Sequence, residues 1–143
     1  MSGVFRATEA FMIGMHATAL LARNTRSCVR AGNIAKECKV SEAHLAKVFQ
    51  RLARSGIVRG ERGPAGGFAL SRSAAEISLM DIWIALEGKP ETGACPFLIP
   101  ACKGRSCSLG LAFIDVCDRM EALMKRTTLR DLEDMIPHAR GDN

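Results

Sequence analysis

Apolar residues along this chain recur mainly in the three- and four-residue steps of an amphipathic helix. Residues 5–23 have a wide apolar face and predict a first helix packed in a core. A short helix is expected over 33–38. A third is expected over 41–55, with Ser41 as the N-cap and Gly56 as the C-cap. The apolar positions of this third helix share one face: Leu45, Val48, Phe49 and Leu52.

After this helix the pattern changes to two short β runs, 57–59 and 68–70, separated by a Gly- and Pro-rich turn. Such runs predict a β-hairpin. Ser78 is then expected to cap a helix that ends at Leu86. The next stretch, 88–106, is irregular, and a loop of this length in a compact domain is usually functional or disordered.

A long helix is predicted over 108–126, followed by a short one that begins at a Thr128–Asp131 capping pair and ends before Pro137. Apolar residues of the long helix recur in steps of four and three, which is the a/d seam of a helix that packs on another helix. The pattern leaves open whether that helix belongs to the same chain or to a second one. The seam consists of Leu109, Phe113, Val116, Met120 and Leu123.

Charge is divided unevenly along the chain, whose 48% hydrophobic and 24% charged residues are typical of a globular protein. Residues 1–72 carry 12 Lys and Arg against 4 Asp and Glu, a balance of +8, whereas residues 73–143 carry 8 against 11, a balance of −3. A basic first half favours nucleic acid or an acidic surface as its partner. The alternative is a solvated basic face.

The apolar run 11–22 is about a dozen residues long, against the ~20 that a membrane-spanning helix needs. Glu9 and His16 would be costly in a signal peptide. We therefore expect no membrane segment and a cytoplasmic location. Thiols stay reduced there, so clustered cysteines more often bind metal or carry out redox chemistry than form disulfides.

The order of the predicted elements is typical of a winged helix-turn-helix: short helix, tight turn, longer helix with a basic outer face, then a hairpin with a Gly-rich basic tip. The longer helix would enter the major groove of double-stranded DNA. A helical hairpin with a solvated basic face is the alternative. The residues expected at the DNA are Ser41, Ala43, His44, Lys47 and Arg51 of the helix, with Arg62 and Gly66 of the hairpin tip.

Cys95, Cys102 and Cys107 form a C-x6-C-x4-C pattern around the irregular segment. Thiolates suit an iron–sulfur cluster or zinc. The absence of a C-x2-C pair argues against a zinc ribbon or a thioredoxin-type enzyme. Three thiolates leave a fourth ligand to be found elsewhere, and three free thiols are the alternative. Of the other cysteines, Cys38 and Cys117 are expected to be small buried side chains and Cys28 to be exposed.

Taken together, these residues resemble the Rrf2 family of bacterial transcription regulators over almost the whole chain. The sequence RGPAGGF at 62–68 is similar to the family's wing, R-G-P-x-G-G followed by Phe or Tyr. Residues 45–58 resemble its recognition helix and the following strand. Residues 128–132 resemble the family's closing T-L-x-acid-L motif. The three-cysteine segment before a long helix resembles the members that bind a cluster.

The resemblance implies a homodimer built through the long helix, which binds a two-fold operator in double-stranded DNA. It also implies an iron–sulfur cluster, 2Fe–2S or 4Fe–4S, on Cys95, Cys102 and Cys107. The state of this cluster would set operator affinity in response to redox, iron or nitric oxide. The implied division is a winged-helix domain 1–88, a cluster loop 89–107, and a dimerisation helix with a short C-terminal helix over 108–143.

The fourth ligand varies within the family. Gly110 stands where one branch has a ligating His, and Glu9 matches the acidic residue that another branch donates from the partner protomer. His16 and His138 are further candidates. The gaps between the cysteines also differ from the commonest family spacing of five residues, which leaves the cluster type open.

Two other functions stay open at this point. The first is a cluster-free winged-helix regulator whose signal is a thiol, a protein partner or a metabolite. The second is a thiol redox enzyme or iron carrier without a DNA function, against which the basic hairpin argues. The expectation is a regulator and not an enzyme.

Overall fold

The computed structural model describes residues 7–24, 27–90 and 107–133 of the chain. It is mainly helical with a single two-stranded antiparallel sheet, which confirms the predicted fold class. In chain order the elements are α1 (Glu9–Arg23), α2 (Ala31–Cys38), α3 (Glu42–Arg54), β1 (Val58–Glu61), β2 (Gly67–Leu70), the short 3-10 helix η1 (Ala74–Glu76), α4 (Leu79–Glu87), α5 (Ser108–Arg126) and α6 (Leu129–Glu133).

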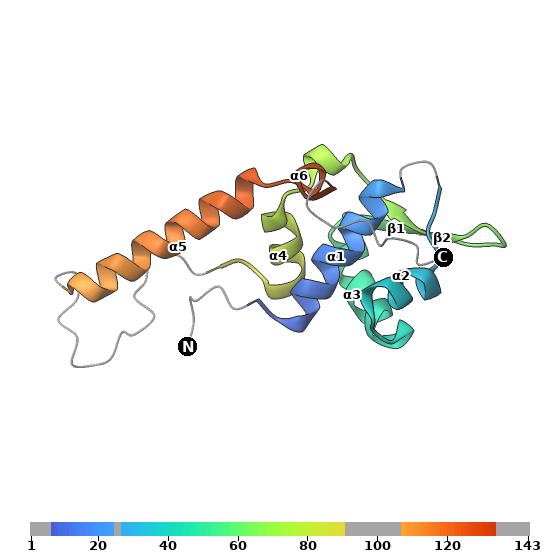
Figure 1. Cartoon of the computed structure of the whole chain (residues 1–143), viewed down its shortest axis with the longest axis horizontal. Coiled ribbons are helices and arrows are strands. Elements are labelled where there is room, and N and C mark those ends of the chain that lie inside the picture. Colours follow the sequence, from blue (N-terminus) through green and yellow to red (C-terminus); the bar gives the residue numbers. More distant parts are fainter. Residues whose placement is uncertain (1–6, 25–26, 91–106, 134–143) are drawn as a thin grey trace, which may run out of the picture.

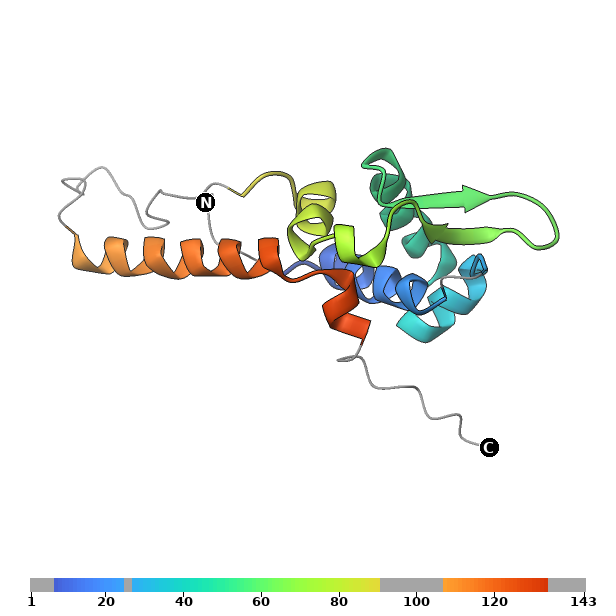
Figure 2. The same cartoon turned by 90° about the horizontal axis from the view of Figure 1, so that it is seen from above.

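The elements form a body and a projecting helix. Helices α1 to α4, α6 and the hairpin make up the body, and α5 extends away from it with its N-terminal end outermost (Figures 1 and 2). The hairpin protrudes from the opposite end of the body. Within the described ranges, every helix is too short or too polar to cross a bilayer.

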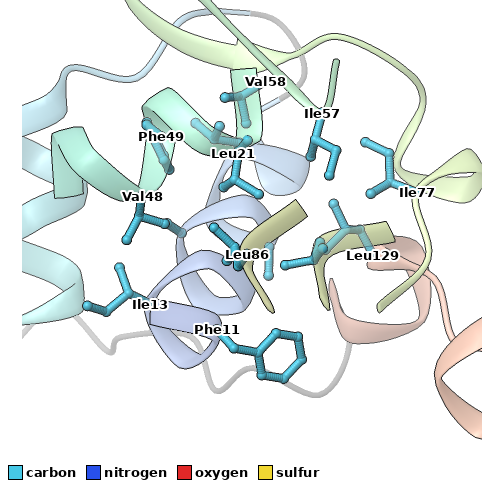
Figure 3. Close-up of a cluster of buried hydrophobic side chains, with 14 of the residues drawn as sticks. Phe11, Ile13, Leu21, Val48, Phe49, Ile57, Val58, Ile77, Leu86 and Leu129 are labelled. Carbon is cyan, nitrogen blue, oxygen red and sulfur yellow. The ribbon is translucent and has the colours of Figure 1, made fainter. Parts of the chain in front are cut away.

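The core lies where α1, α3 and α4 meet, and α6 closes it (Figure 3). Gly14 lets α1 approach α4 closely, because a Cβ there would overlap the side chain of Leu86. Leu129 of α6 has no exposed surface, so α6 belongs to the body's core although the sequence grouped it with α5. Other fully buried side chains are Ile34, Leu45, Leu52, Ile57, Ile77 and Ile82.

Three helices begin at a hydroxyl residue that accepts a hydrogen bond from a first-turn N–H. Thr8 accepts from the N–H of Phe11 at 3.2 Å, and Ser41 accepts from that of His44 at 3.1 Å. Ser78 accepts from the N–H of Asp81, whose carboxylate in turn accepts from the Ser78 N–H at 2.8 Å. Such caps stabilise a helix by about 1 kcal/mol each, and they explain why the starts of α3 and α4 were predicted correctly.

Helix α2 and the end of α3 differ slightly from the prediction. Helix α2 begins at Ala31, two residues earlier than expected, because its N-cap is Arg30, which makes no side-chain cap bond and gives no sequence signal. The C-cap of α3 is Ser55, and Gly56 follows it at φ 69°, a conformation that favours glycine. Helix α5 has the predicted bounds.

The hairpin pairs β1 with β2 in register from Val58 opposite Leu70 to Glu61 opposite Gly67. The connection before α2, expected to be an unpaired polar stretch, contributes to this sheet: Val29 forms an antiparallel bridge with Phe68. The two strands and the bridge together constitute the wing of the fold.

Helix α6 turns back onto the body directly after α5. The Thr128 N–H and hydroxyl donate to the Asp131 carboxylate at 2.7 and 2.8 Å, as the predicted capping pair requires. The backbone N–H of Leu129 donates to Ile77 at 2.9 Å, which ties the start of α6 to the segment before α4. The predicted continuation of this helix beyond Glu133 lies outside the described residues.

Candidate nucleic-acid interface and cysteine loop

Helix α3 is divided into a buried and an exposed face. Its apolar side chains pack in the core, whereas Ser41, Ala43 and Lys47 are exposed and His44 is partly exposed. All four lie in the first half of the helix or at its N-cap. This is the end that a recognition helix directs toward base edges, and its N-terminus also favours a phosphate.

Glu9, predicted as a metal ligand, lies beside the N-terminal end of this helix. Its carboxylate is 4.0 Å from Nδ1 of His44, and the two side chains are 76% and 37% exposed. The structure therefore brings a predicted cluster ligand next to a predicted DNA contact in the same chain. Their separation of 35 positions in the sequence gives no signal of this proximity.

Arg51 was expected to face DNA together with Lys47. Its guanidinium instead donates to the backbone carbonyl of Leu86, in the last turn of α4. A cation suits this position, because the carbonyls at a helix C-terminus carry a partial negative charge. In this conformation Arg51 joins α3 to α4, while Lys47 remains exposed.

The wing tip carries Arg62, which is exposed as predicted. The Gly66 N–H donates to the Gly63 carbonyl at 2.9 Å and closes the turn. A Cβ on Gly66 would overlap the carbonyl oxygen of Glu61. Gly66 is thus required by the turn itself, whereas the sequence had suggested glycine only for close approach to DNA.

Two contacts join the wing to the helices. The rings of Phe68 and Phe49 meet edge to face, with centroids 4.6 Å apart, which attaches the base of the wing to α3. Closer to the tip, the Arg30 guanidinium donates to the Pro64 carbonyl at 2.9 Å. No pattern in the sequence indicates the second contact.

Among the three loop cysteines, Cys107 is the one that lies within the described residues; Cys95 and Cys102 lie outside them. Cys107 is the exposed N-cap of α5, and its sulfur accepts from the Gly110 N–H at 3.5 Å. Its sulfur thus lies at the N-terminal end of a helix, among the backbone N–H groups of the first turn. Residues 7–24, 27–90 and 107–133 by themselves hold no set of three metal-ligating side chains.

Of the other cysteines, Cys28 lies before α2, Cys38 ends α2 and Cys117 lies in α5. Cys117 is buried, as predicted, and Cys38 is partly buried. Cys28 is partly buried rather than fully exposed. Burial raises the pKa of its thiol, and a hydrogen bond with Glu61 and that residue's negative charge add to the effect. Burial also raises the pKa of Cys38, with a further contribution from Glu37.

Glu9 also lies at one end of a surface groove between α1 and the α2–α3 turn. The groove has a volume of about 530 Å³. His16, another predicted ligand, lies in it, and its Nδ1 is 2.7 Å from the carbonyl of Met12. The groove mixes acids, bases and apolar side chains, and its lining includes Cys38.

The predicted seam of α5 is largely exposed in the single chain. Leu109 and Val116 are 58% and 59% exposed, and Met120 and Leu123 are 40% and 42% exposed. Phe113 is partly buried. Other residues of α5 are buried, namely Gly110, Cys117 and Met124, and Met124 belongs to the core of the body.

A helix with an exposed basic face beside a β-hairpin, both attached to one helical core, defines a winged helix-turn-helix regulator. Residues 7–134 match the Rrf2 family, described as iron-dependent transcriptional regulators. The match covers most of the chain, which therefore belongs to the Rrf2 family. Proteins of this family are DNA-binding transcriptional regulators and not enzymes, as expected from the sequence.

Curated relatives agree with this assignment. A protein of Aquifex aeolicus assigned as an HTH-type transcriptional regulator is 32% identical over 120 residues, which cover 81% of this chain and 83% of that protein. The HTH-type transcriptional regulator IscR of Photorhabdus laumondii is 26% identical over 73% of this chain and 63% of its own length. For BadM of Rhodopseudomonas palustris, the match covers 49% of that protein's length.

Solved structures share the fold. CymR of B. subtilis, titled the global cysteine regulator, superposes with a TM-score of 0.81 at 22% identity, covering 94% of this chain and all of that one. IscR of T. potens gives a TM-score of 0.75 at 23% identity, covering 97% and 93%. At these identities the likeness establishes the winged-helix fold and nothing finer.

Proposed function

We propose that this chain is a dimeric transcription regulator whose cysteine loop holds an iron–sulfur cluster, and that the state of the loop sets its affinity for DNA. The observation that carries the proposal is the division of the molecule. The body presents an exposed basic helix and a wing, whereas α5 carries an exposed apolar seam and begins at a thiol. A regulator of this kind acts on chromosomal DNA in the bacterial cytoplasm.

DNA recognition follows from the exposed half of α3. With this half in the major groove, Ser41 and the helix N-terminus meet a phosphate, and Ala43 and His44 face base edges. Lys47 reaches the backbone or a guanine edge, and Arg62 on the wing contacts the neighbouring groove. Arg51 acts indirectly, by holding α3 against α4.

The exposed seam of α5 supports the homodimer. Its apolar side chains recur at heptad spacing along one side of a helix that projects from the body (Figure 2). A second copy of the same helix would cover them and give each dimer two recognition helices. Because a two-fold dimer presents two identical recognition helices, the DNA site that it fits is a two-fold operator.

The cysteine loop supports an iron–sulfur cluster through the chemistry of its donors. Three thiolates from Cys95, Cys102 and Cys107 suit iron, and Cys107 is exposed at the N-terminal end of α5. When bound, such a cluster supplies a centre that gains and loses electrons and reacts with oxygen or nitric oxide. The family's description as iron-dependent supports this assignment.

Glu9 is the proposed fourth ligand, donated by the partner protomer. Within one chain, the N-terminal end of α5 points away from the body that contains α1 (Figures 1 and 2). The Glu9 carboxylate is 76% exposed and therefore accessible to a second protomer. The variant Glu9→Ala is expected to keep iron on three thiolates but to shift its visible absorption spectrum. An unchanged spectrum would remove Glu9 from the ligand set.

Three contacts join the start of α1, the end of α4 and the DNA-binding helix α3. Glu9 pairs with His44, Thr8 donates its hydroxyl to Glu87 at the end of α4, and Arg51 binds Leu86 one residue earlier. The cysteine loop begins directly after α4. A change in the loop that moves the end of α4 is therefore transmitted to both ends of α3. A shift of about 1–3 kcal/mol in DNA affinity suffices for a switch.

The cluster is tested by anaerobic purification, followed by visible absorption, iron and sulfide assays. The wild type is expected to contain about two or four irons per chain with matching sulfide. The variants Cys102→Ala and Cys107→Ala should lose both, whereas Cys28→Ala, which removes a thiol outside the loop, should keep them. A colourless wild type after attempted reconstitution would contradict the cluster.

The DNA interface is tested with a labelled duplex that the wild type enriches from a random-sequence pool. Lys47→Ala combined with Arg62→Ala is expected to weaken binding about a hundredfold and to lower the slope of log affinity against log salt concentration by about 2. The control, Arg72→Ala with Arg126→Ala, removes the same charge elsewhere and should bind as the wild type does. Equal binding by both double variants would contradict the interface.

The structure also limits the cluster-free alternative. Of the four cysteines it describes, Cys107 is the exposed one, while Cys28 and Cys38 are partly buried and burial raises the pKa of each thiol. A thiol signal would therefore also act at the loop. A colourless protein whose DNA affinity changes with oxidant in the wild type but not in Cys107→Ser would establish this second function.

A further inference from the structure

The segment before α2 is paired with the wing through its backbone. The Val29 N–H donates to the Phe68 carbonyl at 2.9 Å, and the Phe68 N–H donates back to Val29 at 2.8 Å. These two bonds form an isolated antiparallel bridge between Val29 and Phe68 of β2. The base of the wing is thereby fixed to the entry of the helix-turn-helix.

Gly67 makes this close pairing possible. Its φ of 156° lies in the region that favours glycine, and a Cβ at this position would overlap the carbonyl oxygen of Val29. The backbones therefore approach more closely than any residue with a side chain would allow.

Beyond this base the wing has little support of its own. Strands β1 and β2 are four residues each, and an isolated two-stranded hairpin of this size is marginally stable. The Phe49–Phe68 ring contact lies at the base. The tip, which carries Arg62, extends past both of these attachments (Figure 2).

Arg30 reaches from the helices to this tip. Its backbone carbonyl accepts from the Asn33 N–H at 3.0 Å in the first turn of α2, so its main chain is fixed to the helix-turn-helix. Its guanidinium extends to the Pro64 carbonyl, two residues from Arg62, at 2.9 Å. A charged donor on a carbonyl is among the stronger single hydrogen bonds.

We propose that Arg30 is a positioning residue for DNA binding: by holding Pro64 it fixes the wing tip relative to α2 and α3, so that Arg62 meets DNA in one placement. The inference rests on the proposed DNA interface and adds to it a residue that acts through Arg62. A tip already held in its bound position loses less conformational freedom on binding, which raises affinity without a new contact.

A double-mutant cycle tests this role in the full-length protein, with the labelled duplex enriched by the wild type. Arg30→Ala is expected to weaken binding about tenfold when Arg62 is present and less than about twofold in the Arg62→Ala background. Arg72→Ala is the matched control, since Arg72 also donates to a backbone carbonyl of its own chain, that of Glu76 at 3.3 Å. It should leave affinity unchanged in both backgrounds.

An equal loss in both backgrounds would mean that Arg30 contacts the DNA itself, and it would overturn the inference. No loss in either background would overturn it as well. Hydrogen exchange on the free protein provides a readout that a direct DNA contact would not move. Arg30→Ala should speed exchange of the Gly66 amide, which is bonded within the tip turn, and leave the amides of α5 unchanged.

The two measurements separate this inference from the proposed function. Equal binding by wild type and Arg62→Ala would overturn the proposed wing contact, and with it the effect of Arg30 on DNA. The hydrogen-exchange measurement still tests whether Arg30 holds the wing tip. Unchanged exchange of the Gly66 amide in Arg30→Ala would show that it does not.

Discussion

The body and helix α5 differ in how far their apolar side chains are exposed. In the body, Leu45, Leu52 and Ile82 have no exposed surface and belong to the core cluster, part of which is drawn in Figure 3. On α5, Leu109 and Val116 are more than half exposed, although the helix has the same kind of amphipathic pattern. The body buries its apolar side chains within one chain, whereas α5 leaves most of its apolar seam exposed.

This difference assigns separate tasks to the two regions. A self-sufficient body can hold α3 and the wing in a fixed arrangement for DNA. An uncovered apolar seam requires a partner, and exposed apolar patches on a regulator mark interaction sites. The cysteine loop joins the two regions, since it begins after α4 and ends where α5 begins. In the proposed function, the state of this loop acts on both the body and α5.

The difference between the body and α5 requires that the buried core of the body supply most of the free energy of unfolding. Leu52→Ala removes a fully buried side chain of α3 and is expected to lower the free energy of unfolding by about 3–4 kcal/mol. Denaturant unfolding at two protein concentrations measures this cost. The matched variant Leu123→Ala, on the exposed seam, should lower stability at low protein concentration and much less at high concentration.

A charged residue on the exposed seam of α5 is expected to weaken dimer association without unfolding the body. Val116→Asp is expected to weaken dimer association by about 3 kcal/mol, more than a hundredfold, because an uncompensated carboxylate would be buried in an apolar contact. Analytical ultracentrifugation measures the dissociation constant. Ala122→Asp adds the same charge on the polar side of α5 and should leave it unchanged. A Val116→Asp protein with the same dimer dissociation constant as the wild type would contradict a dimer contact through this seam.

The cap of α4 offers a smaller change within the body. Ser78→Ala removes the hydroxyl that accepts from Asp81 and is expected to cost about 1 kcal/mol of unfolding free energy. Ser71→Ala, at an exposed position whose hydrogen bond to Ile57 uses only the backbone, should cost less than about 0.5 kcal/mol. Thermal unfolding of the two variants side by side checks the difference, and equal melting temperatures would contradict it.

The smallest effect is expected at the junction of α5 and the body. Hydrogen bonds from the Thr128 backbone and hydroxyl lower the pKa of Asp131 below its ordinary value of 3.8. The folded state thus favours the carboxylate, so its stabilisation is present above pH 3.8 and is lost as the pH falls through the lowered value. Asp131→Asn should be slightly less stable than the wild type at neutral pH. Urea titrations at a series of pH values should show that the difference in unfolding free energy between the two proteins disappears in acid.

Local signals account for the parts of the fold that were predicted correctly. Hydroxyl caps at Ser41 and Ser78 defined the starts of two helices, and the glycines and Pro64 defined the hairpin. The start of α2 was missed because Arg30 lacks a capping side chain. The strand character of Val29 was missed because its partner, Phe68, is distant in sequence and a single apolar residue in a polar stretch carries no period.

The candidate site was predicted in composition but not in geometry. The exposed positions of Lys47 and Arg62 followed from the helical period and from the Gly-rich turn. The bond of Arg51 to Leu86 and the pairing of Glu9 with His44 depend on how separate helices pack, which periodicity does not encode. The assignments of Cys95 and Cys102 remain predictions from the sequence, because both residues lie outside the described ranges.

We propose that the state of the cysteine loop sets the DNA affinity of the body. The most direct test is the dissociation constant for the enriched duplex, measured on anaerobically purified protein before and after its iron is removed, with visible absorption recorded on the same samples. The dissociation constant is expected to change by at least about fivefold as the absorption band is lost. The same dissociation constant with and without iron would contradict it.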